Sequence, residues 1–183
     1  MIRLLIVTIS ILCSGFSLAS SSYQIDLILF AQPQGSVKNI KLDHSTPLIP
    51  ISKEAIQLQT DTNKKHRIYT LLPSSQSKLR DQYYLLSRKS QFQILGHYSW
   101  KQPAKSNSLV ALPKINHDGW QVQGTLKVRQ SNYYLFDADL QCTPPNHQEA
   151  SFSVSQKQRL KGSTIYYLDH PQLGILVKIH KIV

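Results

Sequence analysis

An acid and an imidazole stand side by side near the C-terminus, at Asp169 and His170. A catalytic dyad needs a carboxylate that orients the imidazole and an imidazole that faces a nucleophile. Adjacent side chains on an extended chain point to opposite sides, so this pair does not meet that requirement. Asp169 is placed to accept backbone N–H groups ahead of it, and the following proline and glycine favour an extended residue and then a bend. We interpret the segment as a structural turn motif at the corner of the last hairpin: Asp169, His170, Pro171 and Gly174.

Other chemically active side chains predict no reaction centre. The sequence lacks a Gly-x-Ser-x-Gly nucleophile motif, and its 7 histidines form neither His-x-x-x-His nor His-Glu-x-x-His. Asp137 and Asp139 share a strand face, as glycosidase carboxylates can, but such a pair more often neutralises nearby Lys and Arg. We expect no catalytic residue, no metal ligand and no cofactor. A cell-wall hydrolase is the least favoured alternative.

Residues 1–19 predict a secretory signal peptide. Met1 to Arg3 is basic, Leu4 to Cys13 is apolar, and small residues lead to a cleavage site after Ala19. The apolar run is too short to span a bilayer as a helix, so the cleaved protein is not an integral membrane protein. Residues 20–183 have the size of one domain, in which Cys142 is the only cysteine. We interpret it as a small buried hydrophobic residue, and the core must be stable without an intrachain disulfide.

The formal net charge of +11 predicts an anionic partner. An exported protein seldom meets nucleic acid, so nucleic acid is not expected as a partner. Anionic lipid and the carboxylate-rich peptides of a bacterial cell wall are the remaining candidates.

Hydrophobic patterns in the first half of the domain predict a strand and a helix. Tyr23–Phe30 is apolar on both faces at its end, which indicates a central strand. Residues 32–75 show no sustained period, apart from possible short strands at 55–59 and 68–72. A helix is expected over 76–90, with an N-terminal cap from Ser74 or Ser75. Its apolar stripe contains Leu79, Tyr83 and Leu86.

After the helix the hydrophobic period changes to two, which is typical of strands. The first strand is expected to place Phe92, Ile94, Tyr98 and Trp100 on one face. The next two are expected to bury Trp120, Val122, Leu126, Val128, Tyr134, Phe136, Ala138 and Leu140. The tryptophans could stack on sugar rings, but their register favours core packing. The predicted fold is α+β: a single, mostly antiparallel β-sheet with one main helix packed on one face.

The outward positions of these strands carry cations. We take the following residues as candidate contacts for an anionic polymer or an acidic protein partner: Lys127, Arg129, Lys157, Arg159 and Lys161. The alternative is that they are ordinary solvated strand positions, which are common for Lys and Arg.

Four blocks of the sequence resemble the CsiV family of exported peptidoglycan-binding proteins of gram-negative bacteria. They are "YQIDLILF", "FQILGHYSWKQP", "GTLKVRQSNYYLFDADL" and "QKQRLKGSTIYYLDHPQLGILVKI". The most specific pieces are Trp100–Pro103 and Leu168–Gly174.

The resemblance implies a non-enzymatic periplasmic helper of cell-wall synthesis that affects cell shape. Such a protein binds peptidoglycan and supports a class A penicillin-binding protein together with the outer-membrane lipoprotein activator of that synthase. A different alternative is an envelope protein-interaction scaffold that binds no glycan.

Overall fold

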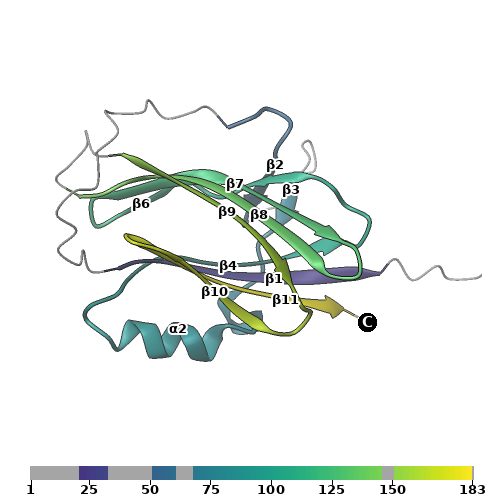
Figure 1. Cartoon of the computed structure of the whole chain (residues 1–183), viewed down its shortest axis with the longest axis horizontal. Helices are drawn as coiled ribbons and strands as arrows, with labels where there is room; N and C mark the ends of the chain where they lie inside the picture. The colour runs from purple at the N-terminus through teal and green to yellow at the C-terminus, as the bar shows by residue number, and fades with distance from the viewer. Residues whose placement is uncertain (1–20, 33–50, 61–67, 146–150, 183) are drawn as a thin grey trace, which may run out of the picture.

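The computed structural model describes residues 21–32, 51–60, 68–145 and 151–182. These residues form two β-sheets and one short α-helix (Figure 1). The helices within these ranges are too short and too polar to span a bilayer. The predicted signal peptide, residues 1–19, lies outside the described residues.

The smaller sheet has four antiparallel strands in the order β10-β11-β1-β4. They are β1 (Ser22–Ala31), β4 (Gln93–Pro103), β10 (Ile165–His170) and β11 (Leu173–Ile182). The prediction that the first strand is central is confirmed, because β1 pairs along its whole length with both β11 and β4.

The larger sheet has seven strands in the order β3-β2-β5-β7-β8-β9, with β6 paired to β7. Its long members are β7 (Trp120–Gln130), β8 (Tyr134–Thr143) and β9 (Phe152–Leu160). Its short members are β2 (Ile56–Gln59), β3 (Ile68–Thr70), β5 (Leu109–Ala111) and β6 (Ile115–His117). The pairs β2–β3 and β2–β5 are parallel, and the other pairs are antiparallel.

The main core lies between the two sheets. Odd-numbered residues of β1, such as Ile25 and Leu27, belong to the same buried cluster as Leu126 of β7 and Phe136 of β8. The Tyr23 hydroxyl crosses the interface and donates to the Val128 carbonyl at 3.0 Å. The predicted inward residues of β7 and β8 are confirmed, as is the core position of both tryptophans.

A second, smaller core lies on the other face of the four-stranded sheet. Even-numbered β1 residues Ile28 and Phe30 pack there against Leu79. The molecule therefore has three layers, with the four-stranded sheet between the seven-stranded sheet and the helix (Figure 1).

The predicted single-sheet α+β fold is wrong, because most described residues lie in the strands of two sheets. A period of two shows which face of a strand is buried but not which sheet the strand joins. Two packed sheets need the same alternation of buried and exposed residues as one sheet covered by a helix.

The helix is shorter than predicted. A 3-10 turn, η1 (Ser74–Gln76), precedes the helix α2 (Arg80–Ser87). The predicted caps Ser74 and Ser75 lie in η1. The N-cap residue of α2 is Leu79, which makes no side-chain capping hydrogen bond, and the Ser77 hydroxyl accepts from the Leu79 N–H at 3.1 Å. The apolar stripe is confirmed: Leu79 is fully buried, and Tyr83 and Leu86 pack beside it.

A β-bulge in β4 overturns one predicted face. Ile94 lies opposite Phe30, whereas Gly96 lies opposite Leu29, so Leu95 is the extra residue. The bulge reverses the alternation. As a result Ile94 joins the helix-side core, and Trp100 joins the core between the sheets.

Candidate functional site

The four outward cations predicted on the strands lie on one face, the outer face of the seven-stranded sheet. Lys127 and Lys157 lie on either side of Asp137 in the register of β7, β8 and β9. In the next outward row of the same register, Arg129 and Arg159 lie on either side of Leu135. We call these two lines of residues the basic rows.

The basic rows carry more positive charge than the one carboxylate between them can neutralise. Arg129 donates to the Asp137 carboxylate at 3.2 Å. Within the described residues, Lys127, Lys157 and Arg159 have no ion pair. Lys161 lies outside the rows, in the turn after β9, where its backbone N–H donates to the Tyr166 hydroxyl at 2.8 Å.

A groove of about 330 Å³ adjoins the basic rows on the same sheet. Its polar lining comes from the next two rows of β7, β8 and β9. In the row next to the basic rows, Asp139 lies between Thr125 and Ser155 and accepts from the Ser155 hydroxyl at 2.7 Å. The groove also contacts Ile51, Ser52 and Leu109.

The groove is not predicted from the sequence, although the sequence contains a signal for part of it. The sequence pattern identifies Asp139 only as a strand-face partner of Asp137, and it does not join Asp139 with the hydroxyls of Thr125, Ser153 and Ser155. The same alternation that predicts the outward cations also places these groups outward. No local pattern, however, predicts that residues 51–52 lie beside them.

The turn motif lies where β10 leads into β11, and its acid and imidazole have separate contacts. Asp169 Oδ1 accepts from the Tyr167 hydroxyl at 2.6 Å and from Gln32 Nε2 at 2.8 Å. These two hydrogen bonds, that of Tyr167 first, lower the pKa of Asp169. The His170 ring instead stacks on Phe152 with centroids 5.2 Å apart.

The proline and glycine of the motif have different roles. Pro171 and Gln172 connect the strands, since His170 lies opposite Leu173. Gly174 is within β11 rather than at the bend, and it needs to be small because a Cβ there would overlap the Phe30 ring. The predicted reason for this glycine, freedom to bend, is therefore replaced by close packing.

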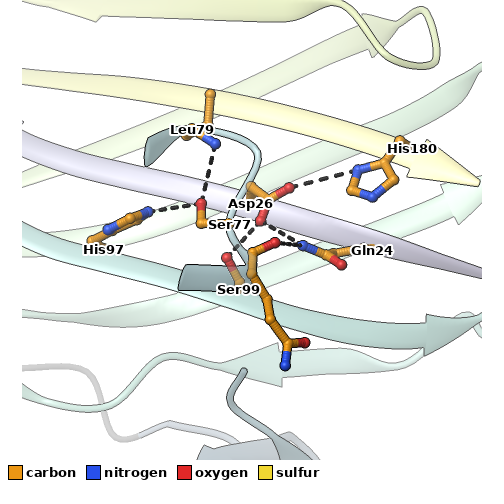
Figure 2. Close-up of polar contacts among 8 residues, drawn as sticks. Gln24, Asp26, Ser77, Leu79, His97, Ser99 and His180 are labelled. Carbon is orange, nitrogen blue, oxygen red and sulfur yellow. Dashed lines mark hydrogen bonds and ion pairs between the residues drawn. The ribbon is translucent and has the colours of Figure 1, made fainter. Parts of the chain in front are cut away.

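A buried polar cluster under the helix was not predicted (Figure 2). Asp26 of β1 is fully buried. Its Oδ1 accepts from Gln24 Nε2 at 2.9 Å and from the Ser99 hydroxyl at 2.5 Å. Its Oδ2 lies 3.6 Å from His180 Nδ1. Neither Oδ2 nor Nδ1 has a hydrogen-bond partner within the described part of the chain.

The same cluster attaches η1 and α2 to the sheet. His97 Nε2 lies 2.8 Å from the Ser77 hydroxyl, which also accepts from the N–H of Leu79, the residue before α2 (Figure 2). The His97 ring stacks on Tyr83 with centroids 5.0 Å apart. Gln24 Nε2 also donates to the Gln76 carbonyl at 2.9 Å.

This cluster does not have the connectivity of a catalytic triad. A triad needs one imidazole that contacts both the carboxylate and the nucleophile. Here Asp26 is next to His180, whereas the serine hydrogen-bonded to an imidazole, Ser77, contacts His97. Burial lowers the pKa of both histidines. We therefore read the cluster as structural.

The remaining candidate groups are buried or dispersed. Burial raises the pKa of the Cys142 thiol to about 12, so the thiol form predominates near neutral pH. Within the described ranges, no three His, Cys, Asp or Glu side chains are grouped to hold a metal ion.

Comparison with known proteins gives one match. The family model described as "Peptidoglycan-binding protein, CsiV" matches residues 2–182. No curated protein and no solved structure matches significantly. Because the family model covers nearly the whole chain, the protein belongs to the CsiV family of peptidoglycan-binding proteins.

Proposed function

We propose that this protein is exported to the periplasm, binds peptidoglycan without cleaving it, and supports a class A penicillin-binding protein together with its outer-membrane lipoprotein activator. The family match supports peptidoglycan binding. The signal-peptide pattern of residues 1–19 supports export. The role beside the synthase is what the resemblance to this family implies.

The observation that carries the wall-binding proposal is the pair of basic rows. Four cations share one sheet face with a single carboxylate between them, and only Arg129 is paired with it. Peptidoglycan stem peptides carry free carboxylates, so the two surfaces are electrostatically complementary.

The candidate reactive groups are paired, buried or hydrogen-bonded, which supports a non-enzymatic role. Asp137 is paired with Arg129, and Cys142 and Asp26 are buried. The Ser77 hydroxyl accepts from the Leu79 N–H. None of these groups is an exposed nucleophile next to a general base, which nucleophilic catalysis requires.

Retention on purified sacculi tests the proposal. Reversing the basic rows with Lys127→Glu, Arg129→Glu, Lys157→Glu and Arg159→Glu should lower retention by about tenfold or more at low salt, because attraction becomes repulsion. The matched control reverses four exposed cations of the helix-side layer: Lys78, Arg80, Arg88 and Lys101. This control should keep most of the retention, and circular dichroism should show that both variants are folded.

Other outcomes identify the alternatives. No retention of the wild-type protein on sacculi stripped of bound protein would favour an envelope scaffold that binds no glycan. Release of soluble muropeptides during the incubation would favour a hydrolase. Equal loss in both charge-reversal variants would show that net charge, rather than this face, determines binding.

A further inference from the structure

A negative side chain of the groove and two positive side chains of the basic rows lie in neighbouring rows of the same sheet face. The row of Asp139 follows that of Asp137 two residues along β8, a spacing of about 7 Å. Asp139 accepts a hydrogen bond from Ser155 but has no cationic partner among the described residues. Lys127 and Lys157, on the neighbouring row, also lack an ion pair there.

This arrangement fits a ligand group that is itself zwitterionic. In the free end of an amino acid the ammonium and the carboxylate are attached to the same carbon, so their nitrogen and oxygen atoms are about as far apart as in a hydrogen bond, roughly 3 Å. Flexible lysine side chains can reach the ligand carboxylate from one row while Asp139 accepts from its ammonium in the next. A purely anionic ligand would leave Asp139 opposed by a like charge.

The face is poorly suited to stacking on sugars. Sugar rings bind well to exposed aromatic side chains. The outward residues of β7, β8 and β9 include no aromatic one, and both tryptophans are in the core. The groove lining instead combines hydroxyl, amide and carboxylate groups with the apolar surface of residues such as Leu109 and Val154, a mixture that suits a peptide.

We propose that the groove binds the zwitterionic amino-acid end of a peptidoglycan stem peptide. Asp139 holds the ammonium, and Lys127 and Lys157 hold the adjacent carboxylate. The inference rests on the proposed wall-binding function and assigns recognition to the peptide rather than to the glycan strand. A free diamino-acid side chain of an uncrosslinked stem peptide provides this chemistry.

Calorimetric titration with defined fragments tests the assignment on the wild-type protein. The probes are a stem tripeptide ending in diaminopimelate, the same tripeptide acetylated only on the diaminopimelate side-chain amine, and glycan chains without peptides. We expect the free tripeptide to bind, and acetylation to weaken binding by about tenfold, as expected for the loss of a charge-assisted hydrogen bond.

A variant locates the ammonium site. Asp139→Asn should bring the affinity for the free tripeptide close to that for the acetylated one. Its amide oxygen can still accept from Ser155, so the fold should be preserved. Asp81→Asn, an exposed acid on α2, is the matched control and should keep the wild-type difference.

The outcomes separate this inference from the proposed function. Retention on sacculi with equal affinity for the two tripeptides, or with a preference for peptide-free glycan, overturns the inference alone. An unchanged preference in Asp139→Asn also overturns it. Loss of sacculus retention in the wild-type protein overturns both. Binding to phosphatidylethanolamine vesicles without binding to the tripeptide would instead indicate a lipid zwitterion.

Discussion

Asp26 lies in the middle of the apolar segment that forms β1, yet its carboxylate is fully buried. Its partners Ser99 and His180 are far away along the chain, and the antiparallel pairing of β1 with β4 and β11 brings them together. An acid inside an apolar strand is visible in the sequence. Its partners are not, because they depend on long-range register.

The histidines of this cluster should make stability depend on pH. Burial lowers the pKa of His97 and His180 from the ordinary value of 6.5; Asp26 opposes the shift in both, and Lys78 and Lys178 add to it in His180. A lowered pKa in the folded state means that the unfolded chain binds more protons below pH 6.5. The two neutral histidines should therefore make their full contribution to the free energy of unfolding above that pH. This contribution should decrease as the pH falls through the pKa values of the folded state.

Urea unfolding at a series of pH values measures this dependence. His97→Gln keeps a side chain that can hydrogen-bond to Ser77 but cannot titrate, so its stability should decrease less between neutral and acidic pH. His117→Gln is the control, since the His117 side chain is 53% exposed and lies outside the cluster. If the His97→Gln curve parallels that of the wild-type protein, His97 is not one of the groups responsible.

Individual elements follow from the sequence where a short pattern determines them. The alternation in β7 and β8 and the stripe on α2 were predicted, because each depends on neighbours two to four residues away. The bulge at Leu95 was not, since one extra residue leaves no local signature. The predicted cap at Ser74 or Ser75 is wrong, because these serines form a 3-10 turn and α2 begins after Leu79 without a side-chain cap.

Leu79 is the main apolar contact that holds α2 to the four-stranded sheet, and it is fully buried against Ile28 and Phe30. Leu79→Ala should lower the free energy of unfolding by about 2–5 kcal/mol, the cost of removing a buried leucine side chain. Leu85→Ala is the matched control, because Leu85 is 61% exposed on the same helix.

Chemical denaturation measures both leucine variants. Sacculus retention of folded Leu79→Ala should match that of the wild-type protein, since the helix and the basic rows lie on opposite sides of the four-stranded sheet. Reduced retention under conditions where the variant is folded would show that the helix layer takes part in wall binding.

At the scale of the molecule, the sequence indicated the net charge, the family and the shared face of four cations. It did not show that this face belongs to a second sheet. That difference matters for function, because a single sheet covered by a helix would place the cations one layer away from the helix. In the observed three layers, a whole further sheet lies between the basic rows and α2.

The three layers predict that wall binding and partner binding can occur together. A molecule that contacts the wall through its basic rows leaves its helix-side layer facing away from the wall (Figure 1). Adding the protein to sacculi should therefore increase the amount of class A synthase, or of its lipoprotein activator, that sediments with them. The variant with charge-reversed basic rows should give no such increase, because it can no longer hold the partner at the wall. A basic protein of unrelated fold is the control for non-specific charge effects. If sedimentation of the synthase instead decreases as the protein is added, the two compete for the wall, and the proposed support of the synthase through a ternary complex is wrong.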